Sequence, residues 1–74
     1  MRFPALTAVK VIKKARKVGF VFDRHAKGSH QIWYHPMKKK RFTIPVHRGK
    51  TLKRKTLKSI INQMGLTLQE FSKL

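Results

Sequence analysis

The sequence predicts an α+β domain in which two long helices pack on one face of a three-stranded antiparallel sheet. Apolar residues recur at helical spacing over residues 7–18 and 51–64, whereas apolar and polar side chains alternate over residues 41–46. The expected order is helix, three strands, helix and a short terminal helix. A chain of 74 residues builds one small core, so we expect a single domain over residues 1–74.

The first helix is expected to start after Thr7, because a threonine hydroxyl can accept a hydrogen bond from the free amides of the first turn. Its apolar stripe consists of Ala8, Val11, Ile12, Ala15 and Val18. Gly19 ends the helix, and the cations near that end suit the negative pole of the helix macrodipole.

Three short segments favour strands because they are rich in aromatic and β-branched residues. They are residues 20–24, 30–35 and 41–46. Residues 35–40, which contain a proline and three lysines, are expected to form the hairpin loop between the second and third strands. Pro45 indicates that the third strand is an edge, since proline has no N–H to donate to a neighbouring strand.

The second long helix follows a turn over residues 47–50 and is expected to end at Gly65. Its apolar face consists of Leu57, Ile60, Ile61 and Met64. Thr67 and Glu70 have the spacing of a capping box, in which each side chain accepts a hydrogen bond from the other residue's amide. We therefore expect a last short helix after Thr67.

The chain carries nineteen lysines and arginines against two acidic residues, which gives a formal charge of +17 and a pI of about 11.8. Such a charge destabilises the compact state by self-repulsion, so a polyanionic partner is expected, and nucleic acid is the commonest one. A membrane surface is the alternative, but it would favour a basic helix with large apolar residues opposite the charge. The cations of this chain are spread over helices, turns and loops instead.

Four scattered histidines, two acids and no cysteine provide no metal-ligand spacing, so no metal, cofactor or disulfide is expected. Residues 1–6 are too short for a secretory signal, and no apolar run approaches the roughly 20 residues that span a bilayer. The cytoplasm is therefore the expected compartment.

A tight turn before the second strand carries the strongest candidates for function. Gly28 allows backbone conformations in which a partner can approach closely, and Ser29 can donate a hydrogen bond to a phosphate. His30 follows at the mouth of the strand. A lone histidine in such a place is usually structural or merely exposed, and His47, after the third strand, is either a turn residue or a second acid–base or phosphate-contacting group.

Four other residues have competing interpretations. Trp33 and Tyr34 can stack on unpaired bases, although packing in the core is the favoured reading of both. His25 and His35 are expected to be ordinary surface residues beside connections. Strand alternation puts His30 and Tyr34 on one face of the sheet but does not say which face.

Three cations crowd the start of the second long helix, where the macrodipole disfavours positive charge. They are Lys53, Arg54 and Lys55. Backbone amides and cations at a helix start together favour an anion, so we expect a phosphate contact there rather than an incidental cluster of charge.

The α-β-β-β-α layout resembles a double-stranded-RNA-binding domain, and five short motifs narrow the resemblance. They are Gly19-Phe20, Lys27-Gly28-Ser29-His30, Pro45-Val46-His47, the segment 56–61 (TLKSII), and Gly65-Leu66 with Leu68-Gln69-Glu70-Phe71. In order and spacing these motifs resemble the HicA toxin family of prokaryotic toxin–antitoxin modules. The similarity covers nearly the whole chain.

The resemblance implies an endoribonuclease that cleaves mRNA, with His30 as the catalytic residue and a HicB-type antitoxin as the partner. A neutral imidazole can take the proton of a ribose 2′-hydroxyl so that its oxygen attacks the adjacent phosphorus, and this chemistry needs no metal. The residues expected to contact RNA are Lys27, Gly28, Ser29, His47, Lys53, Arg54 and Lys55. A non-catalytic RNA-binding protein of the same fold and a DNA-binding protein are the alternatives.

Overall fold

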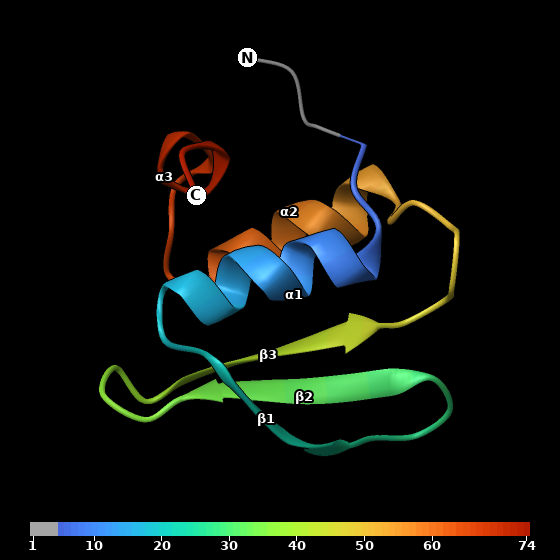
Figure 1. Cartoon of the computed structure of the whole chain (residues 1–74), viewed down its shortest axis with the longest axis horizontal. Helices are drawn as coiled ribbons and strands as arrows, with labels where there is room; N and C mark the ends of the chain where they lie inside the picture. The colour runs from blue at the N-terminus through green and yellow to red at the C-terminus, as the bar shows by residue number, and fades with distance from the viewer. Residues whose placement is uncertain (1–4) are drawn as a thin grey trace.

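A computed structural model describes residues 5–74 and confirms the predicted order of elements (Figure 1). The elements are α1 (Ala8–Lys17), β1 (Val21–His25), β2 (His30–His35), β3 (Lys40–Pro45), α2 (Arg54–Gln63) and α3 (Leu68–Ser72). The second strand has its predicted bounds, whereas the first lies one residue later and the third one residue earlier than expected. Residues 1–4, part of the segment considered as a secretory signal, lie outside the described residues.

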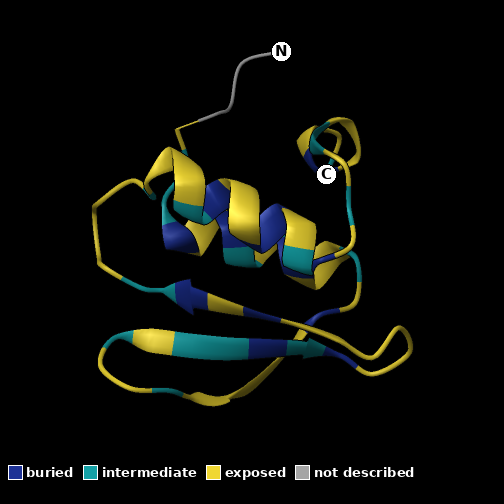
Figure 2. Ribbon diagram, turned by 180° about the vertical axis from the view of Figure 1, so that it is seen from behind, coloured by how far each residue is buried: buried dark blue, intermediate teal, exposed yellow. Residues whose placement is uncertain are grey.

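The three strands form an antiparallel sheet in the order β1-β2-β3. Strand β3 is therefore an edge, as Pro45 predicted. Its amide at Thr43 donates to the side-chain oxygen of Gln63 on α2, at 3.3 Å. Both long helices lie on the same side of the sheet, and no helix of residues 5–74 covers the opposite face (Figures 1 and 2). The fold is the expected α+β arrangement with helices on one face.

The core lies between the sheet and the two long helices. Its buried residues are Ala8, Val11 and Ala15 of α1, Phe20, Trp33 of β2, Phe42 and Ile44 of β3, Leu57, Ile60 and Ile61 of α2, Met64, and Phe71 of α3. The apolar stripes predicted for both long helices are therefore on their buried faces. Each large apolar side chain that leaves water in this way stabilises the fold by about 1.5–3 kcal/mol.

The helix ends follow the predicted local signals. The Thr7 hydroxyl accepts a hydrogen bond from the Lys10 amide, and Thr67 and Glu70 form both bonds of the capping box, at 3.1 and 2.8 Å. Gly19 and Gly65, just past α1 and α2, have φ angles of +103° and +77°, which side-chain-bearing residues rarely adopt. Among the helices described, only α2 has no side-chain capping bond at its start, where Lys53 is the N-cap residue.

His35 is buried, so the prediction of a surface residue at this position is wrong. The residue is only 7% exposed, and its ring makes an edge-to-face contact with Phe20 at 5.2 Å between centroids. Nε2 lies 2.8 Å from the Val18 carbonyl, and Nδ1 accepts the Lys38 amide at 3.1 Å, so the proton is on Nε2. Both partners come from outside β2, which explains why the strand pattern alone could not predict this burial.

Replacing Gly19 with alanine should destabilise the protein more than replacing Gly49. Both glycines have positive φ, but a Cβ at Gly19 would stand 2.8 Å from His35 Nε2, whereas one at Gly49 meets nothing within 4 Å. We expect Gly49→Ala to cost about 1 kcal/mol for the backbone alone. Gly19→Ala should cost about 2–4 kcal/mol, because the His35 hydrogen bond is also disturbed. Urea unfolding followed by circular dichroism measures both, and equal losses would contradict the role given to His35.

The capping box should make stability depend on acid pH through Glu70. Hydrogen bonds from the Thr67 amide and hydroxyl hold the pKa of Glu70 below its ordinary value of 4.5. The carboxylate therefore stabilises α3 fully above about pH 4.5, and this contribution is lost as the pH falls through the lower pKa of the folded state. The melting temperatures of the protein and Glu70→Gln should differ near neutral pH and converge in acid, since glutamine still accepts the amide. A difference that stays constant with pH would contradict this.

Candidate functional site

The turn between β1 and β2 is closed by its own backbone. The His30 amide donates to the Lys27 carbonyl at 3.4 Å, and the Ala26 amide donates to the His30 carbonyl at 2.8 Å. Gly28 takes the left-handed conformation with φ of +69°, and nothing lies within 4 Å of the position of a Cβ there. The turn is therefore both fixed in shape and open to a partner.

His30 lies at the start of β2 with an exposed ring. Its Nδ1 is 3.0 Å from the Lys27 carbonyl oxygen. Because a carbonyl can only accept, Nδ1 carries the proton of the neutral imidazole and Nε2 keeps its lone pair. The side chain thus has its tautomer set by the turn and a free nitrogen available for a proton.

The strand register settles which face of the sheet His30 occupies. His30 pairs with Pro45 and Tyr34 with Arg41, whereas Trp33, between them on β2, is 3% exposed and packs in the core. His30 and Tyr34 therefore lie on the face of the sheet that is turned away from the helices, which we call the open face. The alternation of β2 left this choice undecided.

His47 lies beside the turn although it is 18 residues from Ser29 along the chain. Its Nε2 is 3.3 Å from the Ser29 hydroxyl oxygen. A backbone hydrogen bond joins the same two segments: the Val46 amide donates to the Ser29 carbonyl at 3.0 Å. The structure thus brings His47 next to Ser29, the residue that precedes His30 in the turn.

The loop from His47 to α2 is tied to the rest of the molecule. The Lys50 amide donates to the His47 carbonyl at 3.2 Å, and the Leu52 amide donates to the Leu6 carbonyl at 2.7 Å. A pocket of about 370 Å³ opens along this loop and is lined by Pro45, His47, Lys50, Thr51, Leu52, Lys53 and Thr56. The turn, the end of β3 and the start of α2 lie at the same end of the molecule (Figure 1).

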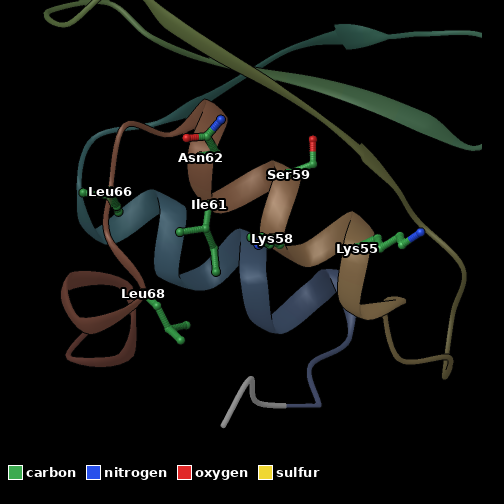
Figure 3. A pocket seen from close by; sticks show the side chains of 7 residues that line it. All are labelled: Lys55, Lys58, Ser59, Ile61, Asn62, Leu66 and Leu68. Carbon is green, nitrogen blue, oxygen red and sulfur yellow. The ribbon is translucent and has the colours of Figure 1, made fainter. Parts of the chain in front are cut away.

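The three cations at the start of α2 do not all line this pocket. Lys53 does, together with His47, whereas Lys55 lines a second pocket of about 600 Å³ with Lys58. The second pocket runs along α2 and the segment that leads into α3, and its lining includes neither the turn nor His47 (Figure 3). It is the larger of the two, but no histidine lines it.

Five residues that line the first pocket were not among the predicted site residues: Pro45, Lys50, Thr51, Leu52 and Thr56. Thr56 follows Lys53 by three residues, so helical spacing would have placed both on one side of α2. Lys50 lies in a loop without periodicity, and no sequence signal distinguishes it from the other lysines.

The other residues considered in the sequence analysis are His25, Trp33 and Tyr34. His25 is exposed at the end of β1, where its ring lies 5.1 Å from that of Phe22. Trp33 donates from Nε1 to the Gln31 side chain at 3.1 Å and is buried, which confirms packing rather than base stacking for this residue. Tyr34 is half-buried on the open face.

Within residues 5–74, no three histidine, cysteine or acidic side chains are grouped closely enough to hold a metal ion. The same part of the chain contains no helix with the length and apolar character needed to cross a membrane.

Comparison with known families gives a match over most of the chain. A family model described as the HicA toxin of bacterial toxin–antitoxin matches residues 8–66, from α1 to just beyond α2. The matched region contains the turn, His30, His47 and Lys53. No curated protein matches the chain at a significant level.

Proposed function

The chain belongs to the HicA toxin family and is thus the toxin of a toxin–antitoxin module, and we propose that it acts as a metal-independent endoribonuclease on mRNA. The observation that carries the proposal is the state of His30. Its Nδ1–H donates to the Lys27 carbonyl, and the residue is exposed on a chain with a formal charge of +17.

His30 is the proposed general base. Nε2 takes the proton of a ribose 2′-hydroxyl, the 2′-oxygen forms a bond to the adjacent phosphorus, and the bond from phosphorus to the 5′-oxygen of the next nucleotide breaks. The leaving oxygen then needs a proton, and His47 is the proposed second group, as proton donor or as phosphate contact. The cations Lys27 and Lys53 stabilise the negative charge that develops on the phosphate oxygens.

The phosphate backbone is proposed to pass along one end of the molecule. Gly28 and Ser29 lie at the turn, and Lys53 lines the pocket that His47 shares. Arg54 and Lys55 extend the basic surface along the start of α2, where backbone amides favour an anion. Phosphate contacts of this kind position RNA without reading its sequence.

The family also implies an antitoxin partner. We propose a HicB-type protein with an acidic surface that covers residues 28–30, because charge complementarity with a chain of +17 supports fast and salt-sensitive association. An mRNA substrate would place the toxin in the cytoplasm.

His30→Ala should lower the rate of RNA cleavage by at least about 100-fold, the usual contribution of a general base, when the assay contains a chelator. The fold and most of the RNA affinity should remain, because the side chain is exposed and adds one contact to a surface of many cations. His25→Ala is the matched control, since His25 is also exposed at a strand end beside the turn but pairs with Gln31, which lies on the face of β2 opposite to His30. The activity of this variant should be unchanged.

Cleavage by His30→Ala at close to the unsubstituted rate would show that the assignment is wrong and would leave His47 to be tested. RNA left intact by the unsubstituted protein itself, despite tight binding, would favour the non-catalytic RNA-binding alternative.

The salt dependence of RNA affinity should show whether Lys53 contacts a phosphate. Each phosphate contact on a single strand contributes about −0.7 to the slope of log affinity against log salt. Lys53→Ser should therefore make the slope less steep by about 0.7, and joint replacement of Lys53, Arg54 and Lys55 by about 2. Lys73→Ser, at the end of α3 away from the turn, is the control and should leave the slope unchanged. A slope unaltered by the triple replacement would remove the helix start from the proposed RNA path.

A further inference from the structure

The open face of the sheet carries an aromatic ring with a cation placed over it. Tyr34 is the only tyrosine of the chain, and the Arg41 guanidinium carbon lies 4.4 Å from its ring centroid. The same guanidinium reaches across β2 to β1, where Arg41 Nε is 3.7 Å from a carboxylate oxygen of Asp23. That carboxylate also accepts a hydrogen bond from Arg24 at 3.1 Å. One layer of side chains thus spans all three strands.

A β-bulge helps to position this layer. The register of β1 against β2 shifts between Phe22 and Arg24, which leaves Asp23 at the irregularity. Bulges re-aim side chains, and here the bulged residue supplies the carboxylate that holds Arg41 over Tyr34. Asp23 is one of only two acidic residues in the chain.

The layer lies on the same face as the proposed catalytic residue. Tyr34 follows His30 by four residues on β2, which corresponds to about 13 Å at roughly 3.3 Å per residue. Ile32 lies between them on this face and pairs with Arg24 and Thr43. A single strand of RNA that leaves His30 along β2 would therefore pass directly over Tyr34.

The chemistry of the layer favours a nucleobase over a phosphate. Tyrosine rings and guanidinium planes both stack on unpaired bases. The Arg41 side chain is 57% exposed, so its outer surface is open to a ligand. Asp23 partly neutralises the guanidinium while fixing its plane, which weakens attraction to phosphate but preserves the surface for stacking.

We propose that Tyr34 and Arg41 form a base-stacking subsite for single-stranded RNA, about 13 Å from His30 along β2. The subsite rests on the proposed function, because it positions the same substrate. It selects unpaired RNA, since the bases of a duplex already stack on each other.

Binding can be tested by nuclear magnetic resonance with an uncleavable probe, a single-stranded 2′-O-methyl hexanucleotide. Because Tyr34 is the only tyrosine, its ring protons are identified without ambiguity. We expect the probe to shift them upfield, and the same sequence as a blunt duplex to leave them in place. Unmoved Tyr34 resonances, with the probe bound elsewhere on the protein, would overturn the proposal.

Variants provide the second readout. Tyr34→Leu should weaken hexanucleotide binding about 5- to 30-fold with an unchanged salt slope, and Tyr34→Phe should bind normally. Arg41→Lys keeps the positive charge but loses the planar guanidinium group, so it should also weaken binding. It provides the test if Tyr34→Leu does not fold. Met37→Ala, in the exposed β2–β3 hairpin, is the control. Affinities within twofold of the unsubstituted protein for both Tyr34→Leu and Arg41→Lys would overturn the subsite.

Cleavage assays separate this proposal from the proposed function. Tyr34→Leu should raise KM for a hexanucleotide while kcat stays near its original value, and should leave cleavage of a dinucleotide, too short to reach Tyr34, unchanged. Equal loss on both substrates would overturn the subsite and leave the endoribonuclease standing. If the unsubstituted protein cleaved neither substrate, the proposed function would fail, and the resonance shift of Tyr34 would still decide whether the base is bound.

Discussion

The alternation of side chains along β2 is the constraint on which both the core and the candidate site depend. Trp33 packs among the helices and donates a hydrogen bond to Gln31, which fixes the buried face of the strand. Because successive residues of a strand point to opposite faces, His30 and Tyr34 must then lie on the open face. A shift of register by one residue would exchange the two faces and bury His30. The core therefore determines where the histidine points.

The acidic and basic residues differ in whether they have a partner of opposite charge or a structural role within the chain. The two acidic residues both have local structural partners: Glu70 completes the capping box of α3, and Asp23 holds Arg24 and Arg41 on the open face. Neither compensates the first turn of α1 or α2, which contain no acid. Most of the positive charge is thus left without an intramolecular counterpart, which costs stability and provides a surface suited to a polyanion.

Local signals made most of the fold predictable. The glycines at the helix ends, the capping box of Thr67 and Glu70 and the bounds of β2 depend on neighbouring residues, and the structure confirms them. The burial of His35 and the proximity of His47 to Ser29 depend on segments far apart in the sequence. Periodicity gives the two faces of an element but not the partner that each face meets, so it could not predict these contacts.

The division of the cations at the start of α2 follows from helix geometry. At 3.6 residues per turn, side chains two positions apart are separated by about 200° around the axis, so Lys53 and Lys55 cannot project toward one pocket. The backbone amides of the first turn, by contrast, all point along the axis in the same direction. A phosphate at this helix start would therefore meet the amides together with the Lys53 side chain, beside His47. On the proposed RNA path, Lys55 would be reached only by a strand that continues around the helix.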